Sequence, residues 1–153
     1  MPDLSNILDN ESIVELREVR HQADVLLALA RFLSVRSGLP TGIIADAMQV
    51  RAAQDPIGVG DGVAIPHARL VGVKKPIGAF ARLQTPVDFA AHDERPCDLV
   101  FALLAPKDED AAHLKALAQI SRAFRDSGLR AALRRQQTCV RELLLGQPRG
   151  AAA

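Results

Sequence analysis

A continuous apolar run, Leu99–Leu104, constrains the fold of this chain more than any other segment. The run reads Leu-Val-Phe-Ala-Leu-Leu and is ended by Pro106. It lacks the alternation of polar and apolar residues that a strand with one wet face shows, so we interpret it as a strand covered on both faces. A strand of this kind belongs in the middle of a sheet that carries helices.

Two helical patterns precede this strand in the sequence. Apolar residues recur at helical spacing after Asp24, which can cap the helix, and Gly38 followed by Pro40 ends it. Thr41 can cap a second, shorter helix that runs to about Arg51. The Gly-x-Pro turn between the two patterns indicates a helical hairpin.

Three helical patterns follow the strand, and a second strand precedes it. Residues 77–83 have strand character. Asp108 or Asp110 can cap a long helix, and Ser127 and Thr138 can cap the two shorter helices after it. The order of helices, strands and helices predicts an α/β (α+β) fold. We expect a single-domain sandwich in which helices flank a central mixed sheet of about five strands.

Length and composition fit one globular domain. The chain has 153 residues, of which 48% are hydrophobic and 24% charged. We expect the domain to occupy residues 1–146 and a disordered tail to occupy residues 147–153. Nineteen basic and 18 acidic residues give a net charge of +1, which argues against a nucleic-acid binder. An aromatic content of 3% argues against stacking of bases or sugars as the main activity.

The remaining composition bears on location and cofactors. No apolar stretch approaches the ~20 residues that span a bilayer, and the N-terminus lacks the basic cluster of a signal peptide. The two cysteines, Cys97 and Cys139, are far apart and form no C-x-x-C motif, which argues against a disulfide scaffold or a cysteine zinc site. We therefore expect a cytoplasmic protein that is not inserted in a membrane and uses no metal or cofactor.

The segment 55–66 carries the first candidate for chemistry. It reads Asp-Pro-Ile-Gly-Val-Gly-Asp-Gly-Val-Ala-Ile-Pro, and its three alternating glycines predict a turn and a short strand. Glycines let a ligand or another backbone approach closely, and free N–H groups in such loops can hold an anion. His67 follows Pro66 directly. Its imidazole can act as nucleophile, base or metal ligand, or it can be a turn histidine without chemistry.

Other charged and titratable residues are weaker candidates. His113 lies near the start of the long helix, where the helix dipole favours anions, although it can equally be a surface histidine. Arg51 can reach a phosphate bound near His67, or it can interact with the dipole of its own helix. His21 and His92 have polar neighbours and are interpreted as solvated. Three arginines near the end of the chain are interpreted as a solvated face: Arg130, Arg134 and Arg135.

Several of these segments together resemble a known family. The stretch Gly-Val-Gly-Asp-Gly-Val-Ala-Ile-Pro-His-Ala-Arg, residues 58–69, resembles the active-site segment of the enzyme IIA domains of the bacterial phosphoenolpyruvate phosphotransferase system. The resemblance is to the fructose/mannitol class, including its nitrogen-regulatory branch. Residues 85–106 and 113–117 are similar to the core strand and the second-histidine helix of that class, and residues 3–8 resemble the opening of the nitrogen-regulatory branch.

The resemblance implies a phosphocarrier. His67 would accept a phosphoryl group on Nε2 from a small histidine phosphocarrier protein, His113 would hydrogen-bond the phosphoryl oxygens, and Arg51 would offset their charge. Partners would approach over four residues: Gly58, Gly60, Gly62 and Pro66. A lone domain of this class fits a regulator, whose phosphorylation state would control its binding to targets such as sensor kinases or potassium transport proteins.

One departure from the family keeps alternatives open. Where the family commonly has Gly-Ser-Thr, this chain has Asp-Pro-Ile at residues 55–57, so two hydroxyls are missing and a carboxylate is added. The chain could instead be a sugar-specific IIA component that passes phosphate to a IIB domain, or a diverged binding module that carries no phosphate. A metal hydrolase built on His67 and His113 would lack a third ligand at recognisable spacing.

Overall fold

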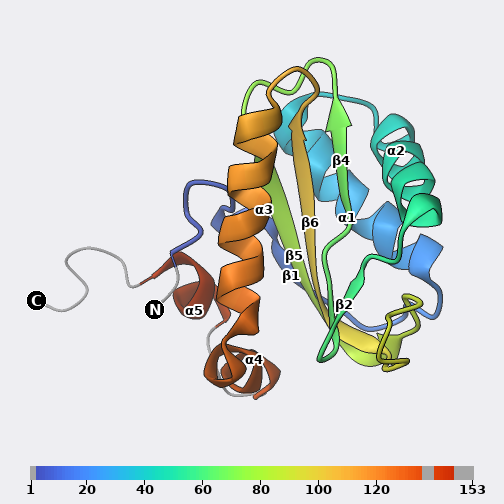
Figure 1. The fold of residues 1–153 in the computed structure, drawn as a ribbon, viewed down its shortest axis with the longest axis vertical. Helices are drawn as coiled ribbons and strands as arrows, with labels where there is room; N and C mark the ends of the chain where they lie inside the picture. The colour runs from blue at the N-terminus through green and yellow to red at the C-terminus, as the bar shows by residue number, and fades with distance from the viewer. Residues whose placement is uncertain (1–2, 136–139, 147–153) are drawn as a thin grey trace, which may run out of the picture.

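A mixed β-sheet with helices on both faces forms the framework of the protein (Figure 1). The computed structural model describes residues 3–135 and 140–146, so the predicted tail and the predicted cap Thr138 lie outside the described residues. The α/β sandwich predicted from the sequence is confirmed, with six strands in place of about five. The strands are β1 (Ile13–Leu16), β2 (Gly58–Gly60), β3 (Val63–Ala64), β4 (His67–Leu70), β5 (Ile77–Val87) and β6 (Cys97–Pro106).

Strand β6 occupies the centre of the sheet. It contains the apolar run seen in the sequence, and every residue from Leu99 to Pro106 is buried. One edge pairs antiparallel with β5. The other edge pairs in parallel with β3 and then β4, with Val63 opposite Leu99 and His67 opposite Leu103. The backbone of β6 therefore aligns the two short strands end to end and fixes where β4 begins.

The two faces of β6 contribute to two separate hydrophobic cores. Helices α1 (Gln22–Ser37) and α2 (Thr41–Gln54) cover one face, and α3 (Asp110–Arg125), α4 (Ser127–Arg134) and α5 (Val140–Leu145) cover the other (Figure 1). Successive side chains of a strand point to opposite faces. Accordingly Val100, Ala102 and Leu104 pack with α1 and α2, whereas Leu99, Phe101 and Leu103 pack with α3 and α4. In the described part of the chain, no helix combines the length and apolar character needed to cross a bilayer.

The predicted helical hairpin is confirmed, with small shifts at its ends. Asp24 is the third residue of α1 and not its cap; its carboxylate accepts a hydrogen bond from the His21 N–H at 3.1 Å. Gly38 ends the helix in the left-handed conformation, at φ +78°. Thr41 is the first residue of α2, and the helix continues three residues past Arg51.

The caps predicted for α3 and α4 are wrong. Glu109, and neither Asp108 nor Asp110, precedes the first residue of α3, and its side chain makes no capping hydrogen bond. The carboxylate of Asp126 caps α4 by accepting hydrogen bonds from two backbone N–H groups, so Ser127 is the first helical residue. The spacing of apolar residues locates a helix, but it does not show which of several adjacent polar residues caps the helix.

Sequence analysis missed β1 and β4 and predicted one short strand where the structure has β2 and β3, and both β5 and β6 are longer than expected. β1 and β4 have four residues each and lack a clean alternation of polar and apolar side chains. β5 continues beyond Leu83 through Thr85 and Pro86 to Val87. Its pairing with β6 is irregular between Arg82 and Val87, which is where proline's missing N–H is tolerated in a sheet.

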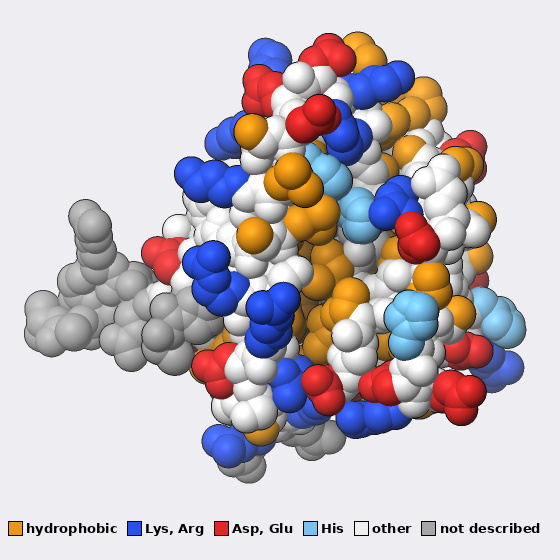
Figure 2. Space-filling model, viewed as in Figure 1, with side chains coloured by type: hydrophobic (Ala, Val, Ile, Leu, Met, Phe, Trp, Pro, Cys, Tyr) orange, Lys and Arg blue, Asp and Glu red, His pale blue; other side chains and the backbone are white. Residues whose placement is uncertain are grey.

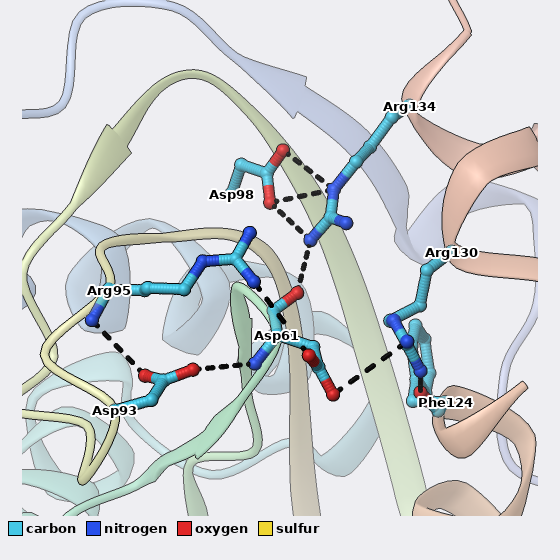
Figure 3. Close-up of polar contacts among 7 residues, drawn as sticks. All are labelled: Asp61, Asp93, Arg95, Asp98, Phe124, Arg130 and Arg134. Atoms are coloured by element: carbon cyan, nitrogen blue, oxygen red, sulfur yellow. Dashed lines mark hydrogen bonds and ion pairs between the residues drawn. The ribbon is translucent and has the colours of Figure 1, made fainter. Parts of the chain in front are cut away.

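Two of the three arginines assigned to a solvated face, Arg130 and Arg134, have structural roles instead (Figure 3). Arg134 pairs with Asp98 through both Nε and Nη2, at 2.9–3.1 Å, and donates to the backbone oxygen of Asp61. Arg130 donates to the carbonyl of Phe124 and lies 3.7 Å from the carboxylate of Asp61. Of the three arginines, Arg135 alone is exposed. The prediction failed because helical spacing does not reveal tertiary contacts. Acidic residues of the β2–β3 turn and of β6 face α4, which carries Arg130 and Arg134.

This correction yields a test of stability. Arg134→Gln should lower the free energy of unfolding by about 1–2 kcal/mol, because it removes charge-assisted hydrogen bonds from a partly exposed pair. Arg135→Gln is the matched control and should change it by less than about 0.5 kcal/mol. Urea unfolding of both variants measures the difference. Equal effects of the two substitutions would contradict the structural role of Arg134.

Candidate functional site

The two histidines singled out by the sequence lie side by side. His67 is the first residue of β4, and His113 is the fourth residue of α3. Their ring centroids are 5.4 Å apart, and the ring planes are tilted by 40°. Both rings line a pocket of about 380 Å³ between α2, β4 and α3. Figure 2 shows histidine side chains in a hollow on this face, with hydrophobic and basic side chains around them.

The backbone fixes the tautomer of His67. Its Nδ1 lies 2.9 Å from the carbonyl oxygen of Ile65. Because a carbonyl oxygen only accepts hydrogen bonds, Nδ1 carries the proton, and the neutral ring keeps its lone pair on Nε2. The Ile65 N–H donates in turn to the Ile57 carbonyl, and the Pro66 carbonyl accepts from Leu103. The sheet therefore holds the group that orients the His67 ring.

Burial and positive charge favour the neutral form of both rings. Burial lowers the pKa of His67 below its usual 6.5, and the charge of Arg51 lowers it further, against an opposing effect of the hydrogen bond to Ile65. Burial also lowers the pKa of His113, and His67, Arg69 and Arg51 act in the same direction. A neutral imidazole is the form that has a lone pair for nucleophilic attack.

His113 presents an unused polar atom. Its side chain is only 9% exposed, and Nε2 is buried without a hydrogen-bond partner among the residues that the structure describes. Buried polar atoms are nearly always paired, so an unpaired one next to a pocket is available to a ligand. The role of this atom as a hydrogen-bond partner of a phosphoryl group on His67 stays a prediction.

Arg51 reaches the same pocket from the last turn of α2. Its Nη1 lies 3.4 Å from the carboxylate of Asp55, the residue that follows α2. Asp55 lies outside the pocket lining, and its side chain is largely exposed. The carboxylate that replaces the usual small residue of the family thus pairs with the arginine and does not point at His67.

Sequence reasoning missed several residues of the pocket. Asp46, Val50 and Gln54 recur at intervals of four along α2, a helical spacing that could have placed them beside Arg51. Arg69 also lines the pocket from β4. Its position two residues after His67 puts both side chains on one face of the strand, but the strand itself was not predicted.

Contacts within the chain explain why glycines occur before His67. A Cβ on Gly58 would lie 2.6 Å from the Cβ of Ala91. Gly62 is buried against Arg134 and Asp98, and its φ is +77°. Gly60 has a φ of +103° and is partly exposed, whereas Pro66 is buried. Internal packing and turn geometry account for these residues, and contact of Gly58, Gly60, Gly62 and Pro66 with a partner stays a prediction.

The other two histidines lie apart from the site. His21 and His92 are both exposed, as expected, and neither lines the pocket. Within residues 3–135 and 140–146, no three histidine, cysteine, aspartate or glutamate side chains gather closely enough to hold a metal ion.

Comparison with known proteins identifies the family. Residues 5–143 match the family described as "Phosphoenolpyruvate-dependent sugar phosphotransferase system, EIIA 2". The chain belongs to this family. It is 37% identical over 131 residues to the nitrogen regulatory protein of Bradyrhizobium diazoefficiens, covering 86% of each chain. It is 32% identical over 136 residues to that of Klebsiella oxytoca, covering 88% of this chain and 84% of the relative.

Solved structures agree with this assignment. Nitrogen regulatory protein IIA-Ntr from Neisseria meningitidis superimposes with a TM-score of 0.82 at 32% identity, over 88% of this chain and 92% of that one. IIA mannitol from Escherichia coli superimposes with a TM-score of 0.72 over 88% and 96% of the two chains. The identity to the second protein is 20%, so this likeness shows the fold alone.

The lowered pKa values of the two histidines predict how stability depends on pH. Above the usual pKa of 6.5 both rings are neutral in the folded and the unfolded chain, so the stability they contribute is fully present. Below 6.5 the unfolded chain binds protons first, and this stability is lost as the pH falls toward the folded pKa. The unfolding free energy of the wild type should therefore drop more between pH 7.5 and 5.5 than that of His67→Gln/His113→Gln. Urea unfolding at both pH values measures the two drops, and identical drops would contradict the prediction.

Proposed function

We propose that this chain is a cytoplasmic phosphocarrier that accepts a phosphoryl group on Nε2 of His67 from a small histidine phosphocarrier protein. It would regulate target proteins through its phosphorylation state. The observation that carries the proposal is the hydrogen bond from His67 Nδ1 to the Ile65 carbonyl, because it leaves the Nε2 lone pair free. Membership of the enzyme IIA family and the likeness to nitrogen regulatory proteins support the same role.

The transfer would be an in-line displacement. The lone pair of His67 Nε2 attacks the phosphorus of the donor's phosphohistidine, while the P–N bond to the donor breaks and its electron pair returns to the donor's ring nitrogen. Little covalent work remains for other groups, so positioning and charge stabilisation dominate. Arg51 supplies a positive charge and N–H donors, and the buried Nε2 of His113 is available to the phosphoryl oxygens.

The phosphoryl group would also change the electrostatics of the site. It adds about 1.5 to 2 negative charges, by analogy with phosphorylated hydroxyl residues, to a pocket whose histidines are neutral at rest. A nearby negative charge raises the pKa of an imidazole, so His113 would shift toward its cationic form and hold the group more firmly. Exposed apolar side chains, Val50 and Leu114, lie on the same elements as the site. A charge placed between them would alter which targets bind, among them sensor kinases or potassium transport proteins.

Phosphoryl transfer with mass mapping tests this role. The chain is incubated with phosphoenolpyruvate, enzyme I and a histidine phosphocarrier protein, and the modified residue is located by mass spectrometry. His67→Ala should abolish labelling, whereas His21→Gln, which changes an exposed histidine outside the pocket, should leave it unchanged. Normal labelling of His67→Ala would refute the assignment. Onward transfer to a IIB domain would favour the role in sugar uptake.

The pair between Arg51 and Asp55 favours one alternative, a binding module that no longer carries phosphate. In this pair the arginine expected to offset phosphoryl charge already has a carboxylate partner. If the chain is a phosphocarrier, Asp55→Asn should raise the equilibrium phosphorylation of His67 about two- to fivefold, the effect of freeing one exposed ion pair. Asp108→Asn, which changes an exposed carboxylate outside the pocket lining, is the matched control. Failure of both the wild type and Asp55→Asn to take up phosphate, with partner binding retained, would favour the binding module.

A further inference from the structure

Arg69 connects the strand that carries His67 to the helix that carries His113. Its side chain lies on the same face of β4 as that of His67, because residues two apart on a strand share a face. Its Nη2 donates to the carboxylate of Asp110 and to the backbone oxygen of Lys107. Asp110 is the first residue of α3 and Lys107 lies in the turn that leads into it, so one guanidinium joins β4 to this end of the helix.

One pair of side chains on the helix faces one pair on the strand. Asp110 and His113 are three residues apart on α3 and therefore neighbours on its surface, about 4.5 Å apart along the axis. His67 and Arg69 are about 6.6 Å apart along β4. Two strand side chains thus meet two helix side chains in antiparallel order, His67 against His113 and Arg69 against Asp110.

The first turn of α3 has few other attachments. The buried residues of α3 are His113, Ala116, Ile120 and Phe124, so none precedes His113. Asp110 and Ala111 are exposed, and the cap residue Glu109 makes no side-chain capping hydrogen bond. A helix end with little apolar burial and no cap frays readily. The bonds to Arg69 are therefore the principal polar attachment of the turn that leads into His113.

We propose that Arg69 and Asp110 form a brace that holds His113 at the correct distance from His67 for phosphoryl transfer. Arg69 is then a positioning residue, and the inference rests on the phosphocarrier function proposed above. Small displacements of a group that stabilises a transition state cost a large part of the rate. The brace acts by fixing the distance between the two histidines. The guanidinium of Arg69 also lines the pocket.

A double-mutant cycle tests the brace. The variants are Arg69→Gln, Asp110→Asn and the combination of both, with Lys115→Gln as an exposed control on the same helix. Each single substitution should slow phosphorylation of His67 about tenfold, and the combination should be no slower than either, because each variant removes the ion pair between Arg69 and Asp110. Arg69→Lys should restore part of the rate, since lysine keeps the charge but lacks the planar fork. Lys115→Gln should leave the rate unchanged.

A second readout separates positioning from direct contact with phosphate and does not need phosphoryl transfer. In NMR spectra of the unphosphorylated protein, the cross-relaxation between ring protons of His67 and His113 should weaken equally in the three brace variants and persist in Lys115→Gln. If Arg69→Gln slows transfer while Asp110→Asn does not, Arg69 contacts the phosphoryl group directly and the brace is wrong. Unchanged rates and unchanged cross-relaxation would also overturn it. If the wild type takes up no phosphate, the phosphocarrier function fails while the cross-relaxation still tests the brace.

Discussion

The burial of β6 on both faces and its pairing on both edges is the constraint on which the rest of the structure depends. Its two faces supply the two hydrophobic cores that hold α1 with α2 and α3 with α4. Its parallel pairing with β4 places His67 opposite Leu103. Because the chain then passes directly from β6 into α3, His113 returns over the same end of the sheet. The register of strand pairing in the sheet thus determines where the two histidines meet.

Charge at the site is arranged in opposed pairs. Arg51 is matched by Asp55, and Arg69 by Asp110, whereas the two histidines between them are neutral at rest. Under the proposed function, a phosphoryl group on His67 would therefore meet two arginines that already have carboxylate partners. These ion pairs limit unspecific binding of anions, because an anion can bind a guanidinium only by displacing the carboxylate that already pairs with it. The chain's overall charge of +1 is consistent with this local balance.

The parts of the fold that depend on local pattern could be predicted from the sequence. The apolar run of β6 and the helical spacing in α1 to α4 indicated the correct elements, and the segment around His67 carried the family resemblance. The N-terminal caps predicted for α1 to α4 were wrong because several polar residues compete at each helix start. β4 was missed because His-Ala-Arg-Leu has no strand signature and pairs only through β6. The partners of Arg134 and Arg69 depend on tertiary contacts, which spacing along the chain does not contain.

The cluster around Asp61 has a consequence for how the molecule opens. Its carboxylate faces Arg95 and Arg130, its N–H donates to Asp93, and its carbonyl accepts from Arg134, so the tip of the β2–β3 hairpin is joined to α4 (Figure 3). Segments tied in this way unfold together and protect each other's amides from hydrogen exchange. We therefore expect the glycine segment before His67 and α4 to open as one cooperative unit. The lifetime of the ordered pocket would then be set partly by residues far from His67.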